Sequence, residues 1–493
     1  MIRRILLSIA LTAGIFTSLP AGVAFADGPQ LHSAGSTWVQ IAMQQWTSDV
    51  NRFGLNVDYQ GIGSTAGRED YMYNLIDFAA TEIPYQPEEL DLYHRELGGN
   101  FRNYQYVPDV AGGTAFMYNL NDPSTGERIR SLRLNSDLIT RIFTGKITSW
   151  RDPAILALNP GVNLPSIPLI PVTRSDSSGT SGQLSLYLAN QQPGAWGAFA
   201  SRLGCTAPCA NWATDAPFVG QSLSSGVTNY VAATPGAINY VEAGYALAKG
   251  FPVAYVQNAS GNFSIPLSEN VSTALSHAQL NPDLTQNLAG VYNAPEPAAY
   301  PISSYSYLIT PTSNIDPAKG NVLGKFMLYA ACGGQQQAPL LGYSPLPENL
   351  VQTVFDAINR INGHPTTPDL STPEGRAACP NPNWTQGGGD SSFAIAAILG
   401  GSSTTGGGGA AAATSGTSSA TGVFSASGAA SKVQVAQQLV ASRRTAAAAS
   451  IAAVHLAPSS VPTMVVALLL LLIFGPLLVH RRRSARRTPE ETA

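Results

Sequence analysis

The pattern of apolar and polar positions is that of a folded domain from about residue 27 to residue 381. Within it, helical stretches with apolar residues three to four positions apart, as at Ile41, Ala42 and Trp46, alternate with short apolar runs. The apolar runs of strand length are residues 55–59, 115–118, 169–172, 253–256 and 307–309. Because strand and helix patterns alternate along the chain, the sequence predicts an α/β fold.

The pattern changes at about residue 387, and Gly, Ser, Thr and Ala then dominate as far as residue 460. Such a composition buries too little apolar surface to offset the conformational entropy lost on folding. We therefore expect residues 387–460 to form a disordered stalk. A second binding module is the alternative for this region.

The N-terminus has the pattern of a secretory signal peptide. Arg3 and Arg4 precede an apolar run over residues 5–16, and Ala24-Phe25-Ala26 fits a small-x-small cleavage site. Residues 1–26 are therefore predicted to be removed on export. A buried first helix is the alternative.

The C-terminus has the pattern of a membrane anchor. Residues 461–479 form a mainly apolar run of nineteen residues, long enough to span a bilayer as one transmembrane helix. Five arginines follow, which places the tail, residues 480–493, in the cytoplasm. The sequence thus predicts an extracytoplasmic protein held in the cell membrane by a C-terminal helix. A buried core helix is the alternative.

Charge and cysteine content narrow the functions that the chain can have. Only 12% of its 493 residues are charged and the net charge is −3, which argues against a nucleic-acid partner. The four cysteines allow three patterns of two disulfides in an oxidising compartment. We favour Cys205–Cys209 with Cys332–Cys379, because the first pair needs only a tight loop. The cysteine spacing does not indicate a zinc site, and no metal is expected.

Three segments place Ser, Thr and Gly directly before a helical stretch. They are residues 34–38 (Ala-Gly-Ser-Thr-Trp), 61–67 (Gly-Ile-Gly-Ser-Thr-Ala-Gly) and 174–180 (Arg-Ser-Asp-Ser-Ser-Gly-Thr). The first N–H groups of a helix lack internal partners and carry partial positive charge, so anions bind there. Glycine allows close approach of the backbone, and hydroxyls add donors. The alternative is three ordinary N-caps.

Two other interpretations apply to single segments. Gly61, Gly63 and Ala66 fit a tolerated form of the dinucleotide fingerprint, although no Gly-Lys pair completes a Walker A loop. Arg174 could present its guanidinium fork to a tetrahedral oxyanion while Asp176 holds that fork in place. The alternative for Arg174 and Asp176 is a surface ion pair of little energetic consequence.

Beyond these segments, residues 142–150 (Ile-Phe-Thr-Gly-Lys-Ile-Thr-Ser-Trp) and the following 152–161 form the most specific motif. Together with residues 174–180, this motif resembles the phosphate-binding protein of the phosphate-specific ABC transporter. The resemblance covers roughly residues 31–357. It implies a two-lobed periplasmic-binding-protein fold with interleaved lobes that close like a hinge. One lobe would hold residues 27–107 and 301–386, and the other residues 108–300.

The resemblance also implies the ligands of inorganic phosphate. They would be Thr37, Trp38, Ser64, Glu82, Arg174, Ser178, Gly179 and Thr180, with Asp176 in support. Three of the matching positions depart from the family pattern: Trp38 replaces Phe, Ser177 replaces Gly, and Glu82 replaces Asp. A carboxylate at position 82 can accept a hydrogen bond from the proton that phosphate keeps and sulfate lacks. The same carboxylate repels sulfate.

The sequence therefore predicts a receptor that captures phosphate and delivers it to an ABC permease, without catalysis and without a cofactor. The rival interpretation is a secreted phosphate-ester hydrolase. The chain contains no G-x-S-x-G elbow and no H-E-x-x-H helix, and its six histidines are scattered. A third interpretation is a surface protein that retains the fold for oxyanion sensing or adhesion.

Overall fold

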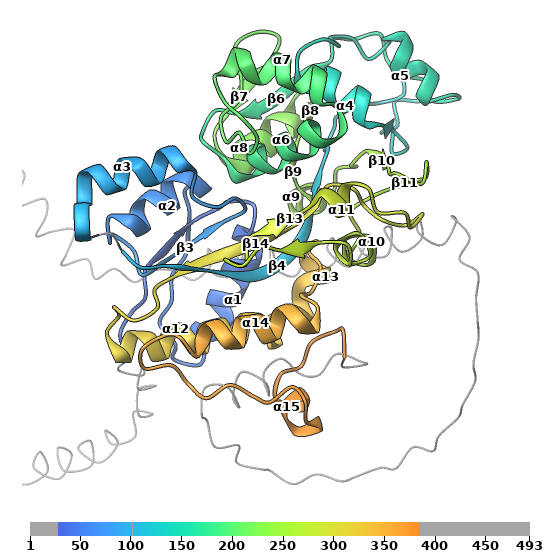
Figure 1. Ribbon diagram of the computed structural model, residues 1–493. Helices are drawn as coiled ribbons and strands as arrows, with labels where there is room; N and C mark the ends of the chain where they lie inside the picture. The colour runs from blue at the N-terminus through green and yellow to red at the C-terminus, as the bar shows by residue number, and fades with distance from the viewer. Residues whose placement is uncertain (1–27, 101, 385–493) are drawn as a thin grey trace, which may run out of the picture. The chain divides into compact units, whose positions relative to one another are not determined.

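The computed structural model describes residues 28–100 and 102–384 (Figure 1). The predicted signal peptide, the whole predicted stalk, the predicted membrane helix and the basic tail lie outside these residues. Among the helices of the described residues, none is both long and apolar enough to cross a membrane.

The larger sheet combines strands from the beginning, the middle and the end of the folded domain. Its strand order is β2-β1-β3-β14-β4-β9. The bounds are β1 Ser33–Gly35, β2 Gln60–Gly61, β3 Phe78–Thr81, β4 Gln105–Ala115, β9 Val241–Glu242 and β14 Ser303–Thr310. β1 runs parallel to β2 and β3, whereas β14 is antiparallel to both β3 and β4. The late strand β14 is thus inserted between two early strands.

Helices cover both faces of this sheet. α2 packs on β1 and β3, and α12 and α14 pack together and against β4, on the lower side in the view of Figure 1. The helices around this sheet are α1 Gln40–Asn51, α2 Ser64–Met72, α3 Pro87–Leu97, α12 Pro317–Ala331, α13 Ala338–Leu341, α14 Glu348–Ile358 and α15 Pro373–Ala378, with the 3₁₀ helices η1 Gly98–Asn100 and η2 Gly333–Gln337.

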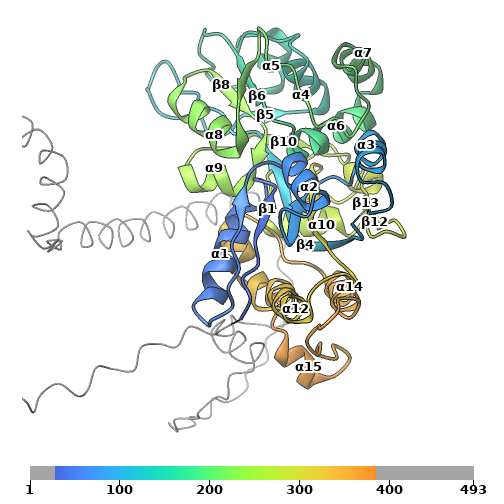
Figure 2. The same cartoon turned by 90° about the vertical axis from the view of Figure 1, so that its left-hand side faces the viewer.

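A second lobe is built on a smaller parallel sheet of order β7-β6-β8. Its strands are β6 Ile170–Arg174, β7 Val219–Gln221 and β8 Ala237–Asn239. The helices of this lobe are α4 Ser136–Phe143, α5 Pro153–Leu158, α6 Gly179–Gln191, α7 Pro193–Leu203, α8 Leu223–Ala233 and α9 Ala243–Lys249. Figure 2 shows this lobe at the opposite end from α12, α14 and α15.

Two further small sheets complete the described fold. One has the order β11-β10-β5, with β5 Arg133–Leu134, β10 Tyr255–Gln257 and β11 Phe263–Ser264. The other pairs β12 Gln279–Leu280 with β13 Gln286–Asn287, between α10 Ser268–Leu275 and α11 Ala289–Tyr292. Gln286 hydrogen-bonds to Tyr305 and Tyr307 of β14, so this hairpin contacts the larger sheet.

The two-lobed α/β fold predicted from the sequence is confirmed, with shifts in the strands. The apolar run 55–59 contributes one bridge, between Val57 and Leu31, and the strand begins later, at Gln60. The run 115–118 contains the end of β4 followed by isolated bridges, and 253–256 overlaps β10 only in part. Apolar runs marked the buried positions here, but hydrogen bonds between strands decided where each strand begins and ends.

Both favoured disulfides are confirmed. Cys205 is bonded to Cys209, and Cys332 is bonded to Cys379. The second bond ties α15 to the end of α12, far from it in sequence. Asn381 strengthens this attachment, because its side-chain amide donates to the carbonyl of Leu346 at 3.1 Å.

Candidate anion-binding site

The three Ser/Thr/Gly segments converge at the junction of the lobes, each at the start of a helix. Segment 34–38 precedes α1, Ser64 begins α2, and Gly179 begins α6. The N–H of Gly179 donates to Oγ of Ser64 at 3.2 Å, which joins the second lobe to the first. The hydroxyl of Thr65 donates to that of Ser177 at 2.9 Å and makes a second link.

A fourth helix terminus, that of α8, joins them and was not predicted. The hydroxyls of Thr37 and Ser224 are 2.8 Å apart, and the N–H of Ser224 also donates to Thr37 Oγ1 at 3.2 Å. The segment 220–226 (Gly-Gln-Ser-Leu-Ser-Ser-Gly) is also rich in Ser and Gly before a helix, and that signal was available in the sequence. Leu223 has a φ of 64°, a strained value for a leucine, directly at this terminus.

Glu82 lies at the end of β3 and is surrounded by hydroxyl donors. Ser36 donates to its Oε1, Ser64 donates to its Oε2 at 2.8 Å, and Ser306 lies 3.4 Å from Oε1. Burial raises the pKa of the Glu82 carboxyl, while the bonds from Ser36 and Ser64 and the charge of Arg174 oppose that rise. The site therefore contains an oriented, buried carboxyl, and its hydroxyl ring includes Ser36, which the predicted ligand set omits.

Arg174 is buried and pairs with the partly buried Asp176, so the interpretation as a surface ion pair is wrong. Arg174 is only 2% exposed, and its Nε donates to Oδ1 of Asp176 at 2.8 Å while Nη2 contacts Oδ2. Its Nη1 reaches Oγ of Ser224 at 3.4 Å. Although burial acts against ionisation of Asp176, the hydrogen bonds and charge of Arg174 and the N–H of Leu223 hold the pKa of that carboxyl below its ordinary value.

Three tyrosines, two of them buried and Tyr245 partly buried, orient the backbone of the first segment. Their hydroxyls donate to three consecutive carbonyls, those of residues 36, 37 and 38, from Tyr59 at 2.6 Å, Tyr245 at 2.5 Å and Tyr343 at 2.6 Å. The N–H of Thr37 donates to no group of the described residues. The carbonyls are thus occupied, and an N–H of this segment remains available to an anion. Sequence analysis missed these tyrosines.

The remaining predicted residues take different positions. Ser178 caps α6, because its Oγ accepts from the N–H groups of Thr180 at 3.1 Å and Ser181 at 3.5 Å. Thr180 is buried beside it. The side chain of Trp38 packs in the core against Tyr343, at 5.6 Å between ring centroids, so only its backbone lies with the segment.

Gly179 is a position where a side chain cannot be accommodated. A Cβ atom there would lie 2.1 Å from Oε2 of Glu82 and 2.7 Å from Oγ of Ser64. Only glycine at position 179 therefore allows the start of α6 to approach the Glu82 carboxyl this closely.

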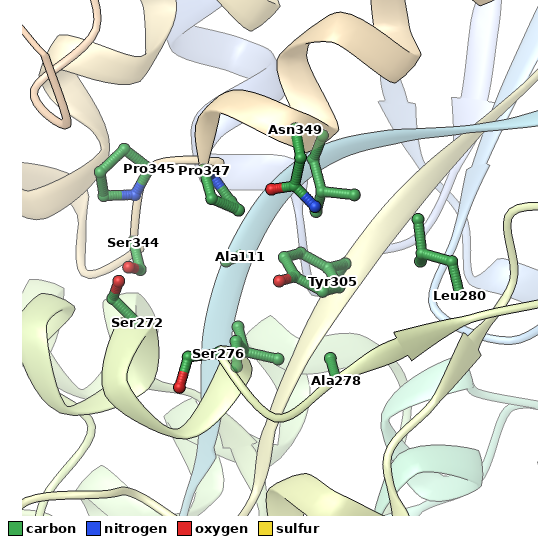
Figure 3. A pocket seen from close by; sticks show the side chains of 12 residues that line it. Ala111, Ser272, Ser276, Ala278, Leu280, Tyr305, Ser344, Pro345, Pro347 and Asn349 are labelled. Atoms are coloured by element: carbon green, nitrogen blue, oxygen red, sulfur yellow. The ribbon is translucent and has the colours of Figure 1, made fainter.

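A separate cavity of about 280 Å³ lies away from these residues (Figure 3). It is bounded by α10, by residues 344–350 and by Ala111 and Tyr305 of the central strands. Its lining contains no charged side chain and none of the residues of the candidate site. In the described part of the chain, no cluster of three or more His, Cys, Asp or Glu side chains is suited to a metal ion.

Two lobes that meet at helix N-termini, with hydroxyls and one arginine around a buried carboxyl, define a solute-binding protein of the periplasmic type. The comparison with known families agrees with this class. The chain belongs to the family described as PBP superfamily domain, whose profile matches residues 22–332.

Curated relatives and solved structures cover the same part of the chain. The chain is 32% identical over 327 residues to the phosphate-binding protein PstS of Xylella fastidiosa, covering 66% of this chain and 84% of that protein. It is 31% identical over 341 residues to PstS 2 of Mycobacterium tuberculosis, covering 68% and 87%. A high-affinity periplasmic phosphate-binding protein bound with phosphate has a similar fold, with a TM-score of 0.53 at 23% identity over 66% of this chain and 93% of that one.

Proposed function

We propose that this protein binds inorganic phosphate outside the cytoplasm, as the substrate-binding component of a phosphate ABC transporter. The observation that carries the proposal is the convergence of four helix N-termini and Arg174 at the junction of the lobes, where the buried carboxyl of Glu82 also lies. This arrangement offers donors to an oxyanion and one acceptor to its proton. The names of the curated relatives support the same ligand.

The donors come from both lobes. The N–H of Thr37 and the backbone at Trp38 would bind from the first lobe. The hydroxyl of Ser64 would bind there too, after its proton turns from Oε2 of Glu82 to the anion. The guanidinium of Arg174 and the groups at the start of α6 (Ser178, Gly179 and Thr180) would bind from the second. Hydrogen bonds to a charged group contribute about 1.5–3 kcal/mol each, and a micromolar site needs only about 8 kcal/mol net. A set of this size is sufficient even after the costs of desolvation and closure.

Glu82 supplies the selectivity. Phosphate near neutral pH keeps at least one proton, which the carboxylate accepts, whereas sulfate offers only lone pairs and like charge. The longer glutamate fits here because Ser36 and Ser64 hold its two oxygens, so the reach of the side chain is set by these bonds.

Lobe closure completes the site. The bonds Ser64 to Gly179 and Thr37 to Ser224 join groups from the two lobes, and they form only where the helix termini approach each other. The proposed division assigns residues 27–107 and 301–386 to one lobe and 108–300 to the other. The pairing of β14 with β3 and β4 supports this interleaving.

The cellular setting follows from the ends of the chain. The proposed signal peptide, residues 1–26, exports the protein, and residues 461–479 anchor it by one helix with the tail 480–493 in the cytoplasm. The stalk, residues 387–460, spans the distance to the receptor domain, and a permease in the same membrane receives the phosphate.

Titration calorimetry of residues 27–458 with phosphate and with sulfate tests the function. We expect phosphate to bind with micromolar affinity or better and sulfate to bind much more weakly. Hydrolysis of p-nitrophenyl phosphate by the same sample would instead support the rival hydrolase, and absence of phosphate binding would support a surface protein that retains only the fold.

A further inference from the structure

Asp109 is a second buried carboxyl close to the site, and the proposed binding mechanism does not use it. It lies on β4 and is 2% exposed. Its Oδ1 accepts from the N–H of Val110 at 2.5 Å, and its Oδ2 has no hydrogen-bond partner among the described residues. A buried polar atom without a partner is costly, so its presence here calls for a reason.

A break in strand pairing places Asp109 near the anion site. Tyr305 pairs with Ala111 and Tyr307 pairs with Pro108, so two residues of β4 stand opposite Ser306 alone. Such a bulge redirects side chains and is frequent beside functional sites. Ser306 is thus the residue opposite Asp109 across the bulge, and its hydroxyl lies 3.4 Å from Oε1 of Glu82.

The surroundings of the two carboxyls determine which of them carries a proton. The ionisable groups that face Asp109 are Glu82, Tyr59 and Tyr343, and none of them is a cation. Glu82, by contrast, has the charge of Arg174 and the bonds from two serines. Two carboxylates close together in a buried site do not both ionise readily. Burial, together with the charge of Glu82, raises the pKa of Asp109 well above its ordinary value.

The direction of the hydrogen bonds follows from that proton. A neutral Asp109 can donate to Oγ of Ser306, and the single hydroxyl proton of Ser306 is then free to point at Glu82. An ionised Asp109 would instead accept that proton and draw it away from Glu82. Ser306 also lies 3.4 Å from the carbonyl of Thr81, so its hydroxyl has a competing acceptor.

We propose that Asp109 is a positioning residue for anion selectivity: as a neutral acid it directs the hydroxyl of Ser306 toward Glu82 and so holds that carboxylate ready to accept the proton of phosphate. This inference rests on the proposed function. It adds a selectivity device in the central strands of the larger sheet, outside the predicted ligand set.

The test compares Asp109→Asn, Asp109→Leu and Ser306→Ala with the parent in the purified full chain. Titrations with phosphate and with sulfate give the selectivity, and infrared spectroscopy detects the C=O stretch of a protonated carboxylic acid. Burial raises the pKa of Asp109 in the folded state, so the unfolded chain loses this proton first. The free energy of unfolding therefore falls as the pH rises from about 3.9, the ordinary pKa of an aspartic acid, up to the raised pKa of the folded state. Asp109→Asn should therefore unfold at no lower a temperature than the parent at pH 7, and it serves as the folded control.

We expect the acid band in the parent at pH 7 and its loss in Asp109→Asn. The Asn side chain can still donate to Ser306, so phosphate affinity should stay within about threefold of the parent. Asp109→Leu should weaken phosphate binding about fivefold or more, which corresponds to the loss of one hydrogen bond. Sulfate binding should weaken less. Adding Asp109→Leu to Ser306→Ala should cause no further loss, because both changes remove the same contact to Glu82.

Two results would overturn the inference. One is the absence of any acid band that depends on Asp109. The other is a loss in Asp109→Leu that is equal for phosphate and sulfate, which would indicate a merely structural role. If the parent itself fails to bind phosphate, the proposed function fails; if the parent binds and Asp109→Leu leaves the selectivity unchanged, only the inference about Asp109 fails.

Discussion

Replacement of Arg174 is the most direct perturbation of the proposed site. Arg174 is 2% exposed and its fork is held by Asp176, with Nη1 3.4 Å from Ser224. Arg174→Ala removes the only cation among the predicted ligands and leaves Asp176 beside the anion without its cationic partner. Arg174→Lys keeps the charge but cannot bond to Asp176 and to phosphate with a planar fork.

The expected size follows from the bonds that are lost. A charge-assisted hydrogen bond in a closed site contributes about 1.5–3 kcal/mol, so Arg174→Ala should weaken phosphate binding roughly tenfold to a hundredfold. The repulsion from Asp176 adds to this loss, and the double change with Asp176→Asn should recover that part. Arg174→Lys should bind with an affinity between those of the Ala variant and the parent.

Titration calorimetry measures the affinities, and thermal unfolding without phosphate separates binding from stability. Arg202→Ala is the matched control, because Arg202 lies in the same lobe and pairs with Asp215 on the surface, with the two side chains 52% and 74% exposed. The control should bind phosphate like the parent. If Arg174→Ala folds and binds phosphate with unchanged affinity, the anion site lies elsewhere.

Further predictions concern the carboxyl, the lobe contact and the anchor. Gly179→Ala should lower phosphate affinity at least about tenfold, because the new Cβ would lie 2.1 Å from Oε2 of Glu82. Gly197→Ala is the control and should not change the affinity, because a Cβ there would meet no other atom within 4 Å. Equal phosphate affinities of the two variants would contradict this prediction. Glu82→Gln should lower the phosphate-to-sulfate selectivity more than the phosphate affinity, and Glu82→Asp should keep selectivity, as competition at fixed pH will show. Tyr245→Phe should weaken phosphate roughly twofold to tenfold by loss of one bond between the lobes, and a titration that matches the parent would exclude that role. Truncation after Pro458 should release a binding-competent protein from the membrane fraction, and retention there would indicate another anchor.

The sequence predicted those site residues that belong to short continuous segments. Residues 61–67 and 174–180 each combine a strand end, glycine and hydroxyls before a helix, and the structure brings both together. The family resemblance assigned Glu82 to the same site, and in the structure its carboxyl accepts a hydrogen bond from the hydroxyl of Ser64. Such segments are recognisable because a helix terminus and its cap are short-range features.

The tyrosines could not be predicted in this way. Tyr59, Tyr245 and Tyr343 are far apart in sequence, and they are three among 19 tyrosines. Their common role depends on the hydrogen bonds that they donate to neighbouring carbonyls, and those bonds exist only after the lobes and the larger sheet have assembled. The local sequence pattern around each tyrosine therefore does not indicate that its hydroxyl bonds to a carbonyl of residues 36–38, which lie far from it in the chain.

Asp109 illustrates another limit of sequence analysis. An alternating strand pattern predicts which side of a sheet a residue faces, but the irregular pairing opposite Ser306 changes that direction. Since a bulge depends on how two strands align, neither strand alone reveals it. The sequence pattern therefore did not single out this acid, whereas the structure buries it beside the site.

The charges of the site explain how a chain with a net charge of −3 can hold an anion. The charge of Arg174 is balanced by Asp176, and Glu82 is itself negative, so long-range attraction contributes little. In the proposed site, binding would then depend on short-range donors: N–H groups at helix termini and hydroxyls whose directions are set by other bonds. Such donors act only when both lobes contribute them together, so affinity depends on closure. This dependence is useful in a transport receptor, because opening the lobes would separate the donors of one lobe from those of the other and release the ligand without any change in charge.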